Sequence, residues 1–232
     1  MTANPQQTPG DETIYFTSLN YAVQLGQFDG VTNVKALRPA GDFGLGSEAR
    51  LKGEVVVLDG IFYSIDSNGK ARVMEDEDSI SYAALKSFRA ECTTVVKNVS
   101  SIKALEEALS EKIQENAFAA IKIRAAFRFI LFRSFEEEQE PFRPVDQIPE
   151  IKFERRNITG TLVGFYTPKS AEVLNSPTYH FHFIDDARTT GGHVLDINVA
   201  EASVEIDYAR EIHIKLPAVA ATEHVDLNTK IK

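Results

Sequence analysis

Short β-rich runs separated by turn residues fill most of this 232-residue chain and constrain its fold more than any other feature. Two of these runs flank Asp59-Gly60, a dipeptide suited to the positive φ angles of a tight hairpin turn. Further runs follow at short intervals, at 118–135, 159–166, 179–184, 193–199, 203–209 and 211–216. Strands that arrive in hairpin-like groups favour an α+β fold with largely antiparallel or mixed β-sheets.

Only a few segments have the spacing of apolar residues that is typical of a helix. Such spacing occurs in residues 18–28 and again in residues 100–116, where one apolar stripe runs along the segment. Ser101 is expected to cap the second helix at its start, and Asn116 is expected to end it.

The charge- and proline-rich run at residues 136–157 is predicted to be a long connecting loop, or alternatively a lid. It would join an N-terminal α+β half, residues 13–135, to a β-rich C-terminal half, residues 158–232. Residues 1–12 are expected to form a flexible arm. Because a chain of this length can bury one substantial core, the two fused halves can count as one domain.

Charge and composition exclude several classes of partner. The formal net charge is −9, and acidic and basic residues are mixed along the chain without a positive stripe, so we expect no nucleic-acid partner. No polybasic anchor and no run of about 18 apolar residues is present, so we expect no membrane partner. Cys92 is the only cysteine, which rules out an internal disulfide and fits a reducing compartment such as the cytoplasm.

The segment from Tyr179 to Asp196, "YHFHFIDDARTTGGHVLD", contains three of the five histidines. Alternation along a strand puts His180 and His182 on one face, with their α-carbons about 6.6 Å apart. The polar, glycine-containing segment that follows reverses the chain, and His193 begins the return strand. If the two strands pair, the three imidazoles meet, and the C-terminal half carries a metal site on a β-hairpin.

Three histidines leave the fourth position of a tetrahedral zinc ion open for water or substrate, which is the arrangement of a catalytic site. Zinc is favoured, although imidazole also suits iron, copper, nickel and manganese. Asp185 and Asp186 are expected to be turn residues, and either of them, or Asp196, could orient a ligand histidine. No partner at strand spacing is expected for His213, which should be exposed, or for His224.

Two other interpretations of the histidines remain open. His180 and His182 could be a hydrogen-bonded surface pair, with His193 nearby by coincidence. A cupin-like metal enzyme also places H-x-H on a strand followed by an acid, here Asp186. Against a cupin, that acid is usually glutamate, and His193 follows His182 too soon.

Several longer motifs resemble the α-acetolactate decarboxylase family in order and spacing. They are "GDFGLGSEARLKGEVVVLDGIFY" from Gly41, "GTLVGFYTPKS" from Gly160 and the histidine hairpin, and the resemblance extends from about Thr13 to Pro217. It implies a homodimeric zinc enzyme that converts 2-acetolactate, a 2-hydroxy-3-keto acid, to acetoin and carbon dioxide, in the route from pyruvate to acetoin and butanediol.

The resemblance also implies roles for individual residues. His180, His182 and His193 would bind zinc, which would act as a Lewis acid and stabilise an enediolate. Arg133 would pair with the anionic substrate, and Glu54 would protonate the enediolate on one face, giving a single acetoin enantiomer. Ser47, the hydroxyl residue after "GLG", would contact the substrate.

The chain also departs from the family pattern. Charged Glu48 and Arg50 are expected near the rim of the pocket. Family members carry a further carboxylate in a C-terminal extension, for which Glu223 or Asp226 would have to stand in. These departures keep a second hypothesis open, a non-catalytic relative that binds a metal or a small ligand on the same scaffold.

Overall fold

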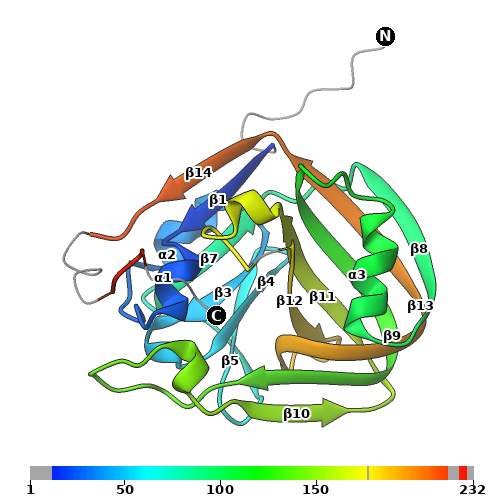
Figure 1. Ribbon diagram of the computed structural model, residues 1–232. Coiled ribbons are helices and arrows are strands. Elements are labelled where there is room, and N and C mark those ends of the chain that lie inside the picture. The colour runs from blue at the N-terminus through cyan, green and yellow to red at the C-terminus, as the bar shows by residue number, and fades with distance from the viewer. Residues whose placement is uncertain (1–11, 177, 219–224, 229–232) are drawn as a thin grey trace.

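The structure, a computed structural model, describes residues 12–176, 178–218 and 225–228, and within them two β-sheets pack face to face (Figure 1). The first sheet has eight strands in the order β14-β1-β7-β3-β4-β5-β6, with β2 paired to β7. Its strands are β1 (Thr13–Thr17), β2 (Thr32–Asn33), β3 (Phe43–Glu48), β4 (Glu54–Leu58), β5 (Ile61–Ile65), β6 (Ala71–Val73), β7 (Ser79–Lys86) and β14 (Glu211–Lys215).

The second sheet has six strands in the order β10-β9-β11-β12-β13-β8. They are β8 (Cys92–Val99), β9 (Phe118–Ser134), β10 (Ile151–Arg155), β11 (Ile158–Thr167), β12 (Thr178–Asp185) and β13 (Gly191–Ala209). Because β9 also pairs with β13, the strands β9, β11, β12 and β13 close into a ring. The ring encloses a second core, to which α3 contributes Leu105 and Leu109.

Few helices accompany the sheets in the described part of the chain. They are α1 (Asn20–Gln24), α2 (Val34–Leu37) and α3 (Ile102–Ser110), with short 3-10 turns η1 (Arg38–Ala40), η2 (Ala49–Leu51), η3 (Val145–Gln147) and η4 (Lys169–Ala171). Apart from the parallel pair of β1 and β14, the strand pairs of both sheets are antiparallel. The predicted α+β fold with largely antiparallel sheets is therefore confirmed. None of the described helices is long and apolar enough to cross a membrane.

Local signals in the sequence place two of these elements. The β4–β5 hairpin turns at Asp59 and Gly60, whose φ angles are 54° and 76°. Ser101 caps α3, because its side chain accepts a hydrogen bond of 3.1 Å from the backbone N–H of Ala104. The helix ends at Ser110, earlier than the expected stop at Asn116.

The chain passes from the first sheet to the second at residues 87–91, between β7 and β8, and returns to the first at residue 210, between β13 and β14, so residues 136–157 lie within the part that forms the second sheet. That predicted loop contains β10, which pairs with β9. Phe153 of β10 stacks on Phe132, while its neighbours in sequence, Lys152 and Glu154, are exposed. Lys152 and Glu154 therefore lie on the outer face of an edge strand, whereas residues 136–150 contain no strand and only the short turn η3. The predicted arm at residues 1–12 lies, except for its last residue, outside the described residues.

The core between the sheets positions the histidines. The first sheet contributes Val56 and Tyr82 to it, and the second contributes Phe165 and Ile184. Since alternate residues of a strand share a face, His180 and His182 lie on the same face of β12 as Ile184. The two histidines therefore lie at the border of the core between the sheets.

Candidate functional site

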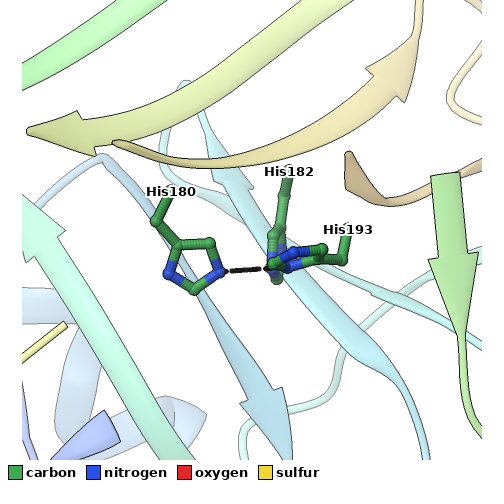
Figure 2. A group of neighbouring side chains, drawn as sticks. All are labelled: His180, His182 and His193. Carbon is green, nitrogen blue, oxygen red and sulfur yellow. Dashed lines mark hydrogen bonds between the residues drawn. The ribbon is translucent and has the colours of Figure 1, made fainter. Parts of the chain in front are cut away.

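Three histidines converge at one end of the β12–β13 hairpin (Figure 2). His182 of β12 pairs in register with His193 of β13. His180 Nε2 lies 3.2 Å from His182 Nε2 and 3.2 Å from His193 Nδ1, and the three potential ligand atoms lie within 4.8 Å of one another. His180 and His182 are 5% and 1% exposed, so they are not a surface pair.

The ring nitrogens fit a metal ion in both spacing and orientation. Nitrogens bound at about 2.0–2.1 Å to a tetrahedral ion lie about 3.3–3.4 Å apart, close to the two distances of 3.2 Å from His180 Nε2. His180 Nδ1 is 2.7 Å from Asn175 Oδ1, and His182 Nδ1 is 2.8 Å from the carbonyl oxygen of Val55. Both partners only accept, so each Nδ1 carries the hydrogen and each Nε2 directs a lone pair into the cluster. The group could hold a metal ion.

The surroundings keep all three imidazoles neutral. Burial lowers the pKa of His180 well below its usual value, and electrostatic interaction with His182 and Arg133 lowers it further. Burial and the positive charge of Arg133 lower the pKa of His193 well below the usual value, although part of the surface of His193 is exposed. The pKa of His182 is lowered by burial despite the opposing effect of Glu54. Neutral rings have the lone pairs that metal binding needs.

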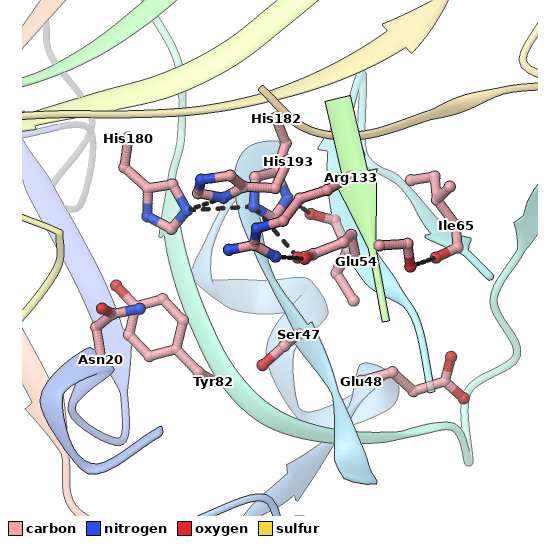
Figure 3. A network of polar contacts seen from close by, with 12 residues as sticks. Asn20, Ser47, Glu48, Glu54, Ile65, Tyr82, Arg133, His180, His182 and His193 are labelled. Atoms are coloured by element: carbon pink, nitrogen blue, oxygen red, sulfur yellow. Dashed lines mark hydrogen bonds and ion pairs between the residues drawn. The ribbon is translucent and has the colours of Figure 1, made fainter. Parts of the chain in front are cut away.

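Glu54 and Arg133 lie beside the cluster (Figure 3). Arg133, on β9, is the cross-strand partner of His193, whereas Glu54 is the first residue of β4 in the other sheet. Arg133 Nη1 donates to Glu54 Oε1 at 2.6 Å, and Glu54 Oε2 lies 3.5 Å from His182 Nε2. Each side chain is 10% exposed, so this charged pair is largely shielded from solvent.

Two further contacts hold the guanidinium of Arg133. Its Nε lies 2.9 Å from Glu150 Oε1, as an ion pair without hydrogen-bond geometry. Its central carbon lies 4.4 Å from the ring centroid of Phe135. Arg133 is thus fixed between two carboxylates and an aromatic ring.

Ser47 lies in the same cavity as the cluster, and its Oγ is 2.7 Å from Ser81 Oγ. Ser47 and Glu54 are cross-strand partners in the β3–β4 pair. The cavity is an open hollow of about 390 Å³ that includes solvent at its mouth. Besides Ser47, Glu54, Arg133 and the histidines, its walls are formed by Asn20, Val23, Gln24, Gly46, Leu51, Tyr82, Phe135, Val145 and Ser176.

The expectation that Glu48 lies near the rim is wrong, and Arg50 does not line the cavity. Glu48 is 3% exposed and accepts a hydrogen bond of 2.8 Å from Arg72, on the face of β3 opposite to Ser47. A register shift between Ser47 and Glu48 marks this point of the strand. Arg50 extends to residues 137–139 and donates to the carbonyl oxygen of Glu138 at 3.2 Å.

The three aspartates near the hairpin form hydrogen bonds with other groups and do not orient the ligand histidines. Asp185 accepts from the backbone N–H groups of Thr189 and Thr190, as expected of a turn residue. Asp186 forms a two-fold hydrogen-bonded pair with Arg124, and Asp196 accepts from the N–H of Ile102 at the start of α3.

The remaining candidates do not line the cavity or lie outside the described residues. His213 is exposed, as expected, and stacks on Tyr15 with ring centroids 4.8 Å apart. Asp226 is exposed and accepts from the backbone N–H of Asn228. Glu223 and His224 lie outside the described residues.

The sequence pattern of the alpha-acetolactate decarboxylase family matches residues 14–229. The chain belongs to this family. It is 34% identical to the alpha-acetolactate decarboxylase of Brevibacillus brevis, over 97% of this chain and 79% of the relative. It is 32% identical to that of Methanosarcina mazei, over 95% of this chain and 78% of the relative. Membership of the family sets aside the cupin-like interpretation.

Solved structures agree with the family assignment. The alpha-acetolactate decarboxylase of Bacillus subtilis strain 168 superposes with a TM-score of 0.89 at 29% identity, covering 94% of each chain. A Staphylococcus aureus protein of unknown function, described as similar to alpha-acetolactate decarboxylase, superposes with a TM-score of 0.88 at 25% identity and covers 93% of this chain and 95% of its own. Both sheets of this chain therefore have the fold of the family.

Proposed function

We propose that the protein decarboxylates 2-acetolactate to acetoin in the cavity formed by the three histidines, Glu54 and Arg133. The convergence of these five side chains from both sheets is the observation that carries the proposal. Membership of the decarboxylase family supports the choice of substrate, a small 2-hydroxy-3-keto acid.

We further propose that the histidines hold zinc, with other divalent transition metals as substitutes. His180 Nε2, His182 Nε2 and His193 Nδ1 would be the ligand atoms, and three neutral imidazoles are a donor set that zinc accepts while keeping an open position. When bound, the ion supplies Lewis-acid stabilisation of negative charge on substrate oxygens.

Decarboxylation requires a site for an anion and for the charge that develops as carbon dioxide leaves. The bond between C2 and the carboxyl carbon breaks, and its electron pair passes into the neighbouring ketone to form an enediolate. Arg133 would pair with this negative charge through its planar set of donors. Because Arg133 is held by Glu54, Glu150 and Phe135, it needs little reorganisation when charge develops.

The enediolate becomes acetoin when C2 gains a proton. Glu54 would take up this proton from solvent at Oε2, the oxygen that faces the cluster, and deliver it to C2, since Oε1 is bound by Arg133. Delivery from one fixed side would give a single acetoin enantiomer. Ser47, which lines the same cavity beside Glu54, would contact the substrate.

Removal of the metal is the first test of this proposal. Dialysis against a chelator is expected to reduce acetoin formation from 2-acetolactate to the spontaneous rate, and zinc is expected to restore it. Unchanged turnover in protein shown by elemental analysis to be metal-free would contradict the proposal. Stoichiometric metal without turnover would favour a non-catalytic metal-binding relative.

We also propose that the protein works in the cytoplasm as a homodimer. The exposed free thiol of Cys92 supports a reducing compartment. Mass determination in solution tests the dimer.

A further inference from the structure

Asn175 is fully buried beside the histidine cluster. Its Oδ1 lies 2.7 Å from His180 Nδ1 and 3.1 Å from Tyr82 Oη. Its Nδ2 donates to Thr167 Oγ1 at 3.4 Å. The side chain thus joins a potential metal ligand, His180, to Tyr82 in the wall of the cavity.

The orientation of the Asn175 amide decides which nitrogen of His180 carries the hydrogen. An amide oxygen only accepts, so the Nδ1 facing it must be protonated and Nε2 must keep its lone pair. With the amide reversed, its NH2 group would face an unprotonated Nδ1. The hydrogen would then sit on Nε2 and point at His182 and His193, where it would block a metal ion.

Neighbouring contacts fix Asn175 in place. It follows η4 in the segment that leads into β12, where the carbonyl oxygen of Leu174 accepts from Tyr82 Oη at 2.9 Å and from the N–H of Asn20 at 3.5 Å. The carbonyl oxygen of Val173 accepts from the N–H of Tyr21 at 3.3 Å. The segment is therefore tied to α1 and to β7, which also line the cavity.

Within the described residues, Asn175 is the one side chain that hydrogen-bonds Nδ1 of His180 or His182. The corresponding partner of His182 is the backbone carbonyl of Val55, which no side-chain substitution removes. The effect of the group that hydrogen-bonds Nδ1 of a ligand histidine can therefore be tested by substitution at position 175.

We propose that Asn175 is a positioning residue whose Oδ1 holds His180 as the Nδ1–H tautomer, with Nε2 directed at the metal. The inference rests on the proposed metal site. Groups that hydrogen-bond ligand histidines typically strengthen metal affinity about 10–100-fold, through tautomer and ring orientation. The same oxygen also accepts from Tyr82 Oη, so it connects this residue of the cavity wall to the proposed metal site.

Two substitutions separate hydrogen bonding from shape. Asn175→Leu removes the acceptor and is expected to weaken zinc affinity about 10–100-fold in competition with a chromophoric chelator. Asn175→Asp keeps the acceptor and is expected to stay close to the wild type. Asn198→Leu, the same change on β13 at a residue that does not line the cavity, is the matched control and should leave the affinity unchanged.

Long-range ¹H–¹⁵N spectra of the metal-free wild type test the inference without any variant, so it stays testable if Asn175→Leu fails to fold. His180 is expected to be protonated at Nδ1. Protonation at Nε2, wild-type affinity in Asn175→Leu, or equal weakening in Asn175→Asp and Asn175→Leu would each overturn the inference. If the wild type bound no zinc, the proposed function would fail, while the tautomer would still report on Asn175 separately.

Discussion

Replacing His182 by alanine is expected to abolish stoichiometric zinc binding and acetoin formation together. His182 is 1% exposed and lies beside both His193 and Glu54, so its loss leaves two imidazoles and an unfilled position in the cluster. Lewis-acid stabilisation is worth several kcal/mol, and each 1.36 kcal/mol changes a rate tenfold, so the rate should fall about a thousandfold or more. Elemental analysis and a rate measurement on the same sample provide the test.

His213→Ala is the matched control for this substitution. His213 lies on β14, exposed and stacked on Tyr15, and does not line the cavity. This variant should keep both zinc and activity. A folded His182→Ala variant that retained stoichiometric zinc would show that the cluster is not the metal site.

Replacing Glu54 by glutamine is expected to lower kcat about 10²–10⁴-fold, the range for loss of a proton-transfer group. Glutamine has nearly the same shape, and the ligand nitrogens come from the histidines, so zinc content should stay stoichiometric. Protonation of the enediolate would then come from solvent, and the acetoin should lose enantiomeric purity. Chiral chromatography of the product measures this second effect.

Glu201→Gln is the control for the glutamate substitution. Glu201 lies on β13 and pairs with Lys97 at 3.2 Å, with both side chains more than half exposed. Its replacement should leave kcat and the enantiomer ratio unchanged. A Glu54→Gln variant with wild-type kcat and a single enantiomer would rule out Glu54 as the proton donor.

The histidine cluster could be predicted from sequence because its geometry is local. His180 and His182 are two residues apart on one strand, and a short turn brings His193 opposite His182. Alternation and hairpin pairing therefore suffice to bring the three rings together.

The partners of the cluster could not be predicted in the same way. Glu54 and Arg133 lie in different sheets, so no local periodicity relates them, and only the family resemblance indicated that they meet. Asn175 and Glu150 lie outside the regular elements, and their roles follow from the packing of distant strands and loops. Neither residue has a sequence motif that distinguishes it from an ordinary loop residue.

The differences between expectation and structure at Glu48 and in β10 have physical causes that the sequence partly contained. Glu48 follows Ser47 on a strand, and alternation already favours opposite faces for the two residues. The burial of Glu48 depends on its hydrogen bond with Arg72, a partner that only the fold brings close. In β10, charged residues alternate with Phe153, which packs inward on Phe132. The charge of the segment predicted a loop, whereas this alternation is typical of a strand.

The central claim is that the three histidines bind one metal ion, and anomalous X-ray scattering at the zinc absorption edge tests it most directly. One peak per chain is expected, about 2.0–2.1 Å from His180 Nε2, His182 Nε2 and His193 Nδ1. In crystals of zinc-supplied, active protein, the absence of a peak among these nitrogens, or a peak bound by other residues, would contradict it.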